Sequence, residues 1–326
     1  MSSFDELPDA EKLERYERFA RKALTAYALE EADLRYLGDS ANVMFRVQTE
    51  NSRWALRTCN PGRDHKLIMR ELLWLVSLCR DTDLGVPEPV IMRSGDLFRS
   101  VSMPGLSGFR ACMLFRWVNG QFADDALTNR HLEAMGILTA KLHKHAETFR
   151  WPEELEPVRV SSETVARSLP MATLKTHYSQ DDAELLYDTI PLIQQAMHSL
   201  GSGSDVCGVI HGDLQHDNIL FHEGVARVID FECVQWNHYA YDIATVLSDL
   251  RGRSDIDELK AAYVSGYLTI RQLPCDLDEH IPVFDMLRGF TMIARILETP
   301  RLRRHAGAES ILDSAVQKAK RLLEVQ

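Results

Sequence analysis

The chain has 326 residues, with 37 Lys and Arg against 48 Asp and Glu, a formal net charge of −11 and 45% hydrophobic residues. This length predicts about two lobes of roughly 100–200 residues each, and the apolar fraction excludes global disorder. No run approaches the ~20 uncharged apolar residues that span a bilayer, and the charged N-terminus lacks the apolar core of a secretory signal. Because clustered Lys and Arg bind phosphate backbones, the acidic balance argues against nucleic acid as the main ligand. We therefore expect a cytoplasmic enzyme that binds neither nucleic acid nor membrane.

The first 120 residues alternate between helical and strand-like patterns. Apolar residues at helical spacing predict a helix over residues 9–28. Three strand-like runs follow, with short polar turns between them: residues 33–37, 43–48 and 53–58. Helical spacing returns over residues 64–80, and further strand-like runs surround 94–96 and cover 111–118. These patterns predict a five-stranded antiparallel sheet that carries one long helix.

Beyond residue 120 the pattern becomes mainly helical. Residues 131–146 form an apolar stripe at helical spacing, one or two further helices are expected within 161–199, and helical patterns resume at residue 241. A compact β segment interrupts them at 206–231. The expected fold class is α+β with two lobes, a β-rich lobe of residues 1–117 and a mainly helical lobe of residues 118–326.

The residues most suggestive of chemistry lie within the β segment. An apolar run leads into His211 and Asp213, a second apolar run follows Asn218, and after a turn the next run ends at Asp230. We expect this hairpin to bring Asp213, Asn218 and Asp230 to one rigid platform. Their oxygens suit Mg²⁺, which binds to one or two carboxylates together with substrate phosphates. A carboxylate beside the metal can orient a hydroxyl group and accept its proton.

A family resemblance rests on this motif. The spacing His211-x-Asp213-x-x-x-x-Asn218, followed by Asp230 on the next strand, resembles the catalytic loop and metal-binding Asp of the kinase-like phosphotransferases. Gly212 makes the loop similar to that of the aminoglycoside phosphotransferase, choline kinase and type II homoserine kinase group; eukaryotic protein kinases usually carry Arg there. The resemblance implies a bilobal protein-kinase-like fold. It also implies transfer of the γ-phosphoryl group of ATP or GTP to an alcohol, with Mg²⁺ as cofactor.

The resemblance assigns a role to each residue of the motif. Asp213 would orient the acceptor hydroxyl or act as its general base, and His211 would support the loop. Asn218 and Asp230 would hold the Mg²⁺ that bridges the nucleotide phosphates. Asp242 stands where the family often has an Asp that braces the catalytic loop.

In the first lobe the resemblance implies a nucleotide site. Glu71, on the long helix, would pair with a cation on the third strand, and that cation, Arg57, would hold the α- and β-phosphates. The group usually has Lys at this position, and Arg keeps the charge but differs in shape. The turn at 38–42, which includes Ser40 and Asn42, would cover the phosphates.

The segment 113–120 would be the hinge between the lobes. It comprises the end of the last strand-like run and the turn Asn119-Gly120. By resemblance, backbone groups near Arg116 and Val118 would meet the edge of the adenine.

The sequence leaves the acceptor open. Residues 240–298 carry ten Asp and Glu against six Lys and Arg, which suits a cationic acceptor such as an amino sugar or an amino alcohol. Arg288 and Arg295 in the same segment could instead bind the carboxylate of a homoserine-like acceptor. Two alternatives to a small-molecule kinase remain, a bacterial stress-type protein Ser/Thr kinase and a nucleotide-binding pseudoenzyme. The oligomeric state is not indicated, and His143 and His145 are expected to be surface or packing residues.

Overall fold

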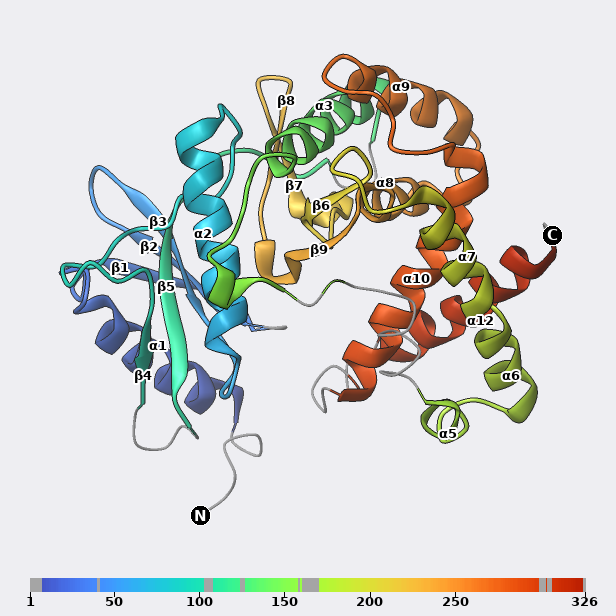
Figure 1. Ribbon diagram of the computed structural model, residues 1–326. Coiled ribbons are helices and arrows are strands. Elements are labelled where there is room, and N and C mark those ends of the chain that lie inside the picture. Colours follow the sequence, from blue (N-terminus) through green and yellow to red (C-terminus); the bar gives the residue numbers. More distant parts are fainter. Residues whose placement is uncertain are drawn as a thin grey trace. The chain divides into compact units, whose positions relative to one another are not determined.

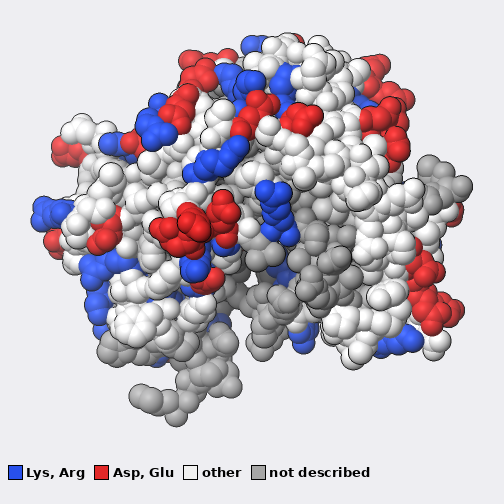
Figure 2. Space-filling model, viewed as in Figure 1, with Lys and Arg blue, Asp and Glu red and all other residues white. Residues whose placement is uncertain are grey.

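The computed structural model describes residues 8–39, 42–102, 108–123, 127–157, 159, 170–298, 303 and 307–324. The chain divides into two compact units, Met1–Asn119 and Gly120–Gln326. Within the described residues no helix is long and apolar enough to cross a membrane. On the face drawn in Figure 2, acidic and basic side chains are interspersed.

The N-terminal unit is built on a five-stranded antiparallel sheet with the order β1-β2-β3-β5-β4 (Figure 1). Its elements, in chain order, are α1 (Asp9–Leu24), β1 (Asp33–Gly38), β2 (Val43–Gln48), β3 (Arg53–Thr58), α2 (His65–Asp81), β4 (Arg99–Val101) and β5 (Arg110–Arg116). Successive residues of a strand point to opposite faces of the sheet. Accordingly, Leu56 packs in the apolar cluster formed with α1, whereas Arg57 contacts Glu71 of α2. The two helices therefore cover opposite faces at β3.

Three elements of this unit differ from the expected ones by more than one residue. The first helix ends at Leu24 rather than residue 28, and a turn follows it in which Ala28 has a φ of 55°. The run before residue 94 forms only an isolated bridge between Pro89 and Phe115, because proline lacks the N–H that a strand ladder requires. The last strand ends at Arg116 rather than residue 118.

The C-terminal unit is mainly helical and contains two small antiparallel sheets, β6 with β9 and β7 with β8 (Figure 1). Its helices are α3 (Asn129–Ala146), α5 (Met171–Leu174), α6 (Gln180–Asp188), α7 (Ile190–Leu200), α8 (Tyr239–Ser248), α9 (Ile256–Leu268), α10 (Leu277–Glu298) and α12 (Ala308–Glu324). Its strands are β6 (Cys207–Ile210), β7 (Ile219–His222), β8 (Val225–Val228) and β9 (Gln235–His238). Short 3-10 turns lie at Glu153–Leu155, His216–Asn218 and Phe231–Cys233. Of the expected helical segment 161–199, residues 161–169 lie outside the described part.

Two features of this unit position the loop between β6 and β7. Helix α8 is buried from Tyr239 to Leu247 and so forms the centre of the core. Helices α3 and α9 cross at close range: a Cβ on Gly136 would lie 2.0 Å from the Tyr263 carbonyl oxygen, and one on Gly266 would lie 2.1 Å from that of Glu133. Since only glycine permits this approach, the crossing fixes the side chains of α9 against α3.

Candidate active site

The loop after β6 is held by the carboxylate of Asp242 on α8. The backbone N–H of His211 donates to Asp242 Oδ2 at 2.9 Å, and that of Gly212 donates to Oδ1 at 2.8 Å. Gly212 has a φ of 79°, and a Cβ there would lie 2.4 Å from the Cys233 carbonyl oxygen. The expected bracing role of Asp242 is confirmed, and glycine is required at position 212.

His211 supports the loop from inside. The residue is fully buried, and its Nδ1 accepts a hydrogen bond from the Asp213 N–H at 3.2 Å. Nε2 therefore carries the proton, which it donates to the Ile229 carbonyl oxygen at 3.1 Å. The imidazole also packs edge-on against Phe231, with ring centroids 4.6 Å apart. His211 thus joins the loop to the segment that carries Asp230.

Asp213 lies beside three donors. Its Oδ1 accepts from Gln215 Nε2 at 2.6 Å and from Arg288 Nη2 at 3.4 Å. The side chain amide of Asn218 donates to the Asp213 carbonyl oxygen at 2.9 Å and approaches Oδ2 at 3.5 Å. The Asp213 side chain keeps 16% of its exposure, and the nearest donor to Oδ2 among the described residues is the Asn218 amide at 3.5 Å.

Asn218 and Asp230 are brought together by the β7–β8 hairpin. The N–H of Ile229 donates to the Asn218 carbonyl oxygen at 2.9 Å, so Asp230 follows directly on the residue paired with Asn218. Asp230 has a left-handed backbone, with φ 64° and ψ 65°, and for a residue other than glycine such strain occurs often at functional sites. The backbone pairing therefore places Asp230 next to the residue that is paired with Asn218, at the end of the hairpin that follows the loop of Asp213.

The donor set fits a hard divalent cation. The Asn218 amide nitrogen is bound within the loop, which leaves its Oδ1 without a hydrogen-bond partner among the described residues. One amide oxygen and one carboxylate match Mg²⁺, which completes its shell with water and substrate phosphates. The described residues contain no group of three His, Cys, Asp or Glu side chains that would hold a metal by themselves. Such a cation would therefore depend on substrate oxygens.

A second arginine of α10 balances the charge of these carboxylates. Arg295 donates to Glu232 Oε1, and its Nη1 lies 3.0 Å from Cys233 Sγ. Interactions with Cys233 and then with Glu232, Asp213 and Asp230 raise the pKa of the Arg295 guanidinium. The carboxylates of Asp213 and Asp230 thus both interact electrostatically with Arg295.

Behind Asp242 lies a buried polar chain. His143 Nε2 is 3.4 Å from Asp242 Oδ2, and His143 Nδ1 is 2.9 Å from the Tyr267 hydroxyl. Arg271 donates to the same hydroxyl at 2.6 Å. Burial lowers the pKa of His143, so the neutral imidazole accepts from Tyr267 and donates to Asp242. The prediction that His143 is a surface or packing residue missed this polar role.

In the N-terminal unit, Arg57 and Glu71 form the expected pair. Arg57 Nη2 lies 2.5 Å from Glu71 Oε2, and both side chains are buried. The guanidinium also lies 3.0 Å from Met113 Sδ and 5.2 Å from the centre of the Phe115 ring. Asn42, at the end of the predicted phosphate turn, is 8% exposed, and Ser40 lies outside the described residues.

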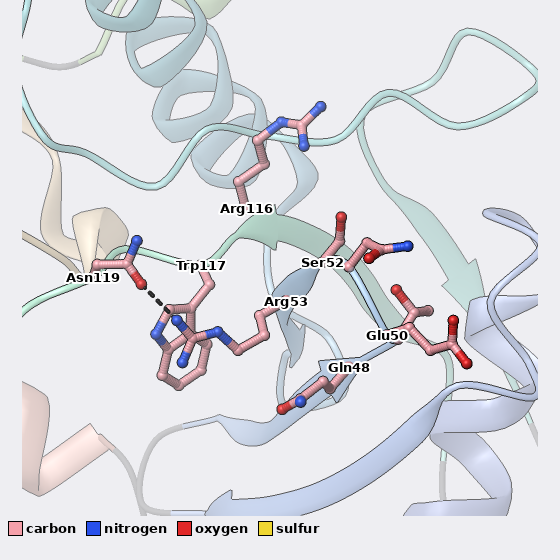
Figure 3. A pocket seen from close by; sticks show the side chains of 9 residues that line it. Gln48, Glu50, Ser52, Arg53, Arg116, Trp117 and Asn119 are labelled. Atoms are coloured by element: carbon pink, nitrogen blue, oxygen red, sulfur yellow. Dashed lines mark hydrogen bonds between the residues drawn. The ribbon is translucent and has the colours of Figure 1, made fainter.

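The segment after β5 is fixed by Arg53. The Trp117 N–H donates to the Arg53 carbonyl oxygen at 3.1 Å, while the Arg53 guanidinium donates to Asn119 Oδ1 at 2.9 Å and lies over the Trp117 ring (Figure 3). These residues line a pocket of about 380 Å³. The Arg116 N–H is already bound to the Glu88 carbonyl oxygen at 2.9 Å. Val118 is therefore the better candidate for an adenine contact, since its N–H has no partner among the described residues.

Residues 34–277 match the model of a protein family described as the phosphotransferase enzyme family, APH. The chain belongs to this family. It is therefore a kinase that phosphorylates hydroxyl groups of small molecules.

The phosphotransferase is similar in sequence to other small-molecule kinases. It is 21% identical over 274 residues to amicoumacin kinase of Bacillus subtilis, and this alignment covers 80% of this chain and 76% of that protein. It is 28% identical over 257 residues to homoserine kinase of Beijerinckia indica, and this alignment covers 74% of this chain and 72% of that protein. These relatives give no support to the protein-kinase alternative.

Solved structures confirm the kinase-like fold. A microcompartment-associated aminopropanol kinase superposes with a TM-score of 0.73 at 26% identity and covers 93% of this phosphotransferase and 94% of that chain. An amicoumacin kinase in complex with AMP-PNP, Ca²⁺ and Ami also gives a TM-score of 0.73, at 19% identity, with 94% of this chain and 95% of that chain covered. The expected α+β fold with an antiparallel N-terminal sheet is thereby confirmed.

Proposed function

We propose that this phosphotransferase moves the γ-phosphoryl group of ATP or GTP to the hydroxyl group of a small acceptor that also carries an amino group: an amino sugar, an amino alcohol or a homoserine-like molecule. The observation that carries the proposal is the loop held by Asp242, on which Asp213 lies beside Asn218 and the segment of Asp230. The names of the relatives, which include kinases for homoserine and aminopropanol, support the acceptor class.

Asp213 acts on the acceptor. Gln215 and Arg288 occupy Oδ1, so Oδ2 accepts the hydrogen bond of the incoming hydroxyl and fixes its oxygen in line with the γ-phosphorus. The oxygen–phosphorus bond forms as the bond from the γ-phosphorus to the bridging oxygen of the nucleotide breaks. The hydroxyl proton passes to Asp213, and the nucleoside diphosphate leaves. Because this transition state is loose, positioning contributes more than the basicity of the carboxylate.

The nucleotide phosphates require positive charge. Asn218 Oδ1 and Asp230 would hold Mg²⁺, which when bound neutralises phosphate charge. Arg57, fixed by Glu71, would contact the α- and β-phosphates. We assign nucleotide binding to the N-terminal lobe, residues 1–117, and acceptor binding to residues 118–326. At the boundary between them, the Val118 N–H would donate to the adenine.

An ADP-release screen tests this function. Purified chain is incubated with Mg-ATP or Mg-GTP and a panel of amino alcohols, amino sugars, nucleosides and homoserine. We expect turnover on at least one acceptor, and a fall of about 10²–10⁴-fold in Asp213→Ala, the range typical of a lost general base. Asp217→Ala is the matched control, since that carboxylate lies on the same loop and its side chain is 82% exposed.

Two results would contradict the proposal. One is an Asp213→Ala enzyme that keeps more than about a tenth of wild-type turnover. The other is nucleotide-dependent thermal stabilisation without turnover on any member of the panel, which would favour a pseudoenzyme.

A further inference from the structure

Arg288 on α10 is a buried cation with unused donors. The residue is only 9% exposed, and its side chain makes one hydrogen bond with the described residues, the 3.4 Å contact from Nη2 to Asp213 Oδ1. A guanidinium carries five N–H donors, and the others have no partner among the described residues. Some side-chain nitrogens of the described residues are shielded from solvent and have no hydrogen bond, but those of Arg288 do not belong to this group. The unbonded nitrogens of Arg288 therefore remain in contact with solvent. The unused donors of Arg288 therefore open to solvent beside Asp213.

Two other acidic residues of this region, Asp285 and Glu232, have cationic partners of their own. Asp285, one turn earlier on α10, is bound by Arg251 at 2.5 Å, by Ser248 at 2.6 Å and by Lys318 at 2.9 Å. Glu232 is bound by Arg295. Arg288 therefore has Asp213 as its only ionic partner among the described residues, and its remaining donors can bind a second anion that comes from solvent.

Asp249, at the end of α8, supplies the opposite charge nearby. Its Oδ2 accepts from the His216 N–H at 3.1 Å and from His216 Nδ1 at 3.2 Å. Oδ1 has no hydrogen-bond partner among the described residues, and the side chain is 16% exposed. Burial raises the pKa of Asp249, and hydrogen bonds from His216 and the charge of Arg288 oppose that rise. Asp249 and Arg288 thus lie within electrostatic range but are not hydrogen-bonded to each other.

We propose that Arg288 and Asp249 select an acceptor that is an α-amino acid with a hydroxyl group on its side chain. The guanidinium binds the α-carboxylate with its unused donors, in the planar fork that suits carboxylates. Asp249 binds the α-ammonium group, and Asp213 receives the hydroxyl. This inference rests on the proposed function and narrows its acceptor class, because an amino sugar or a simple amino alcohol would leave Arg288 without a second anion.

Three acceptors that differ by one group test the inference. They are L-homoserine, 3-amino-1-propanol, which lacks the carboxylate, and 4-hydroxybutanoate, which lacks the ammonium group. With the full chain and Mg-ATP, kcat/KM for L-homoserine should exceed that for either analogue by about tenfold or more, because each analogue loses one charge-assisted contact.

Variants assign the two contacts. In Arg288→Gln the preference for L-homoserine over 3-amino-1-propanol should collapse by at least about tenfold, mainly through KM. In Asp249→Asn the preference over 4-hydroxybutanoate should collapse in the same way. Arg321→Gln and Asp257→Asn, both at exposed positions, are the matched controls. Arg288→Lys keeps the charge without the fork and should give an intermediate preference, and circular dichroism verifies that each variant is folded.

Calorimetric binding of L-homoserine to the chain loaded with Mg-ADP separates this inference from the proposed function. If no acceptor is phosphorylated but L-homoserine binds the wild type and not Arg288→Gln, the inference holds and the proposed function fails. If L-homoserine neither reacts nor binds, the inference is overturned, whether or not other alcohols react. It is also overturned if Arg288→Gln lowers kcat equally for all three acceptors, which would place Arg288 on the transferred phosphoryl group.

Discussion

Arg57 and Glu71 form an ion pair with 2.5 Å between Nη2 and Oε2 and with side chains 5% and 2% exposed. They come from β3 and α2, so the pair joins the sheet to the helix on the face opposite α1. Removing one partner of a buried pair leaves an uncompensated charge, which is far more costly than losing a surface pair. The pair therefore contributes to the stability of the N-terminal unit as well as to the proposed phosphate contact.

Glu71→Ala should destabilise the protein strongly. We expect the free energy of unfolding to fall by about 3–5 kcal/mol, because the buried guanidinium of Arg57 would lose the carboxylate that lies 2.5 Å from it. Glu88→Ala is the control, since Glu88 pairs with Arg116 at an exposed site and should cost about 0–1 kcal/mol. Urea denaturation of both variants measures the difference. Equal losses would show that the Arg57–Glu71 pair is not effectively buried.

Asp242→Asn should impair turnover while the nucleotide still binds. The two N–H groups of His211 and Gly212 donate to different oxygens of Asp242, and in Asn the NH2 that replaces one of them is itself a donor. One of the two hydrogen bonds would be lost, and the loop that carries Asp213 would lose its fixed position. We expect kcat to fall by about 10²-fold, as for a misplaced catalytic group, with little change in the Kd of Mg-ADP measured by calorimetry. A variant with unchanged kcat would show that this brace is not needed for the reaction.

The buried imidazole of His143 predicts a pH dependence of stability. Its pKa is lowered in the folded state by burial, whereas in the unfolded chain it returns to about 6.5. Below that pH the unfolded state binds the proton that the folded state excludes, so stability falls as the pH decreases. Between pH 7 and 5 the wild type should lose more stability than His143→Gln, by up to about 1.4 kcal/mol per pH unit. Thermal melts of both proteins across this pH range measure the difference in stability. The contributions of the other histidines cancel because both proteins contain them. Parallel curves of stability against pH would contradict the assignment to His143.

The close crossing of α3 and α9 predicts different outcomes for two glycines. Gly136→Ala would place a Cβ 2.0 Å from the Tyr263 carbonyl oxygen, which forces the helices apart and should cost about 1–3 kcal/mol or more. Gly289→Ala, on α10, meets only ordinary contacts from 3.4 Å outward and should be neutral or stabilising by up to about 1 kcal/mol. Thermal melts compare the two. A tolerated Gly136→Ala would mean that the crossing can relax.

Local patterns in the sequence were sufficient for the loop that carries Asp213 and for most of the N-terminal sheet. The motif from His211 to Asn218 has a fixed spacing, and the strands of the hairpin that follows it are apolar, so both the loop and the position of Asp230 could be predicted. The pairing of Arg57 with Glu71 followed from the family resemblance and from helical spacing on α2. In each of these cases the signal lies within a short stretch of chain.

Features that depend on distant parts of the chain were not predicted. Strand β9 consists of Gln235–His238, which have no apolar alternation, and it forms only because β6 offers an unpaired edge. The contact between His143 and Tyr267 joins residues 124 positions apart, and that between Arg288 and Asp213 spans 75. Single-residue patterns carry no information on such pairs, which exist only once α3, α9 and α10 have packed.

The central claim is that Asp213 directs a phosphoryl group onto an acceptor hydroxyl. The most direct measurement is ³¹P NMR of the reaction of Mg-ATP with the best acceptor, since a new phosphate monoester signal identifies the product and its point of attachment. We predict a signal of a phosphate ester on the acceptor oxygen that grows with wild-type enzyme and is reduced by about 10²-fold or more with Asp213→Ala. An equal rate of ester formation by both proteins, or release of inorganic phosphate alone by the wild type, would contradict the account.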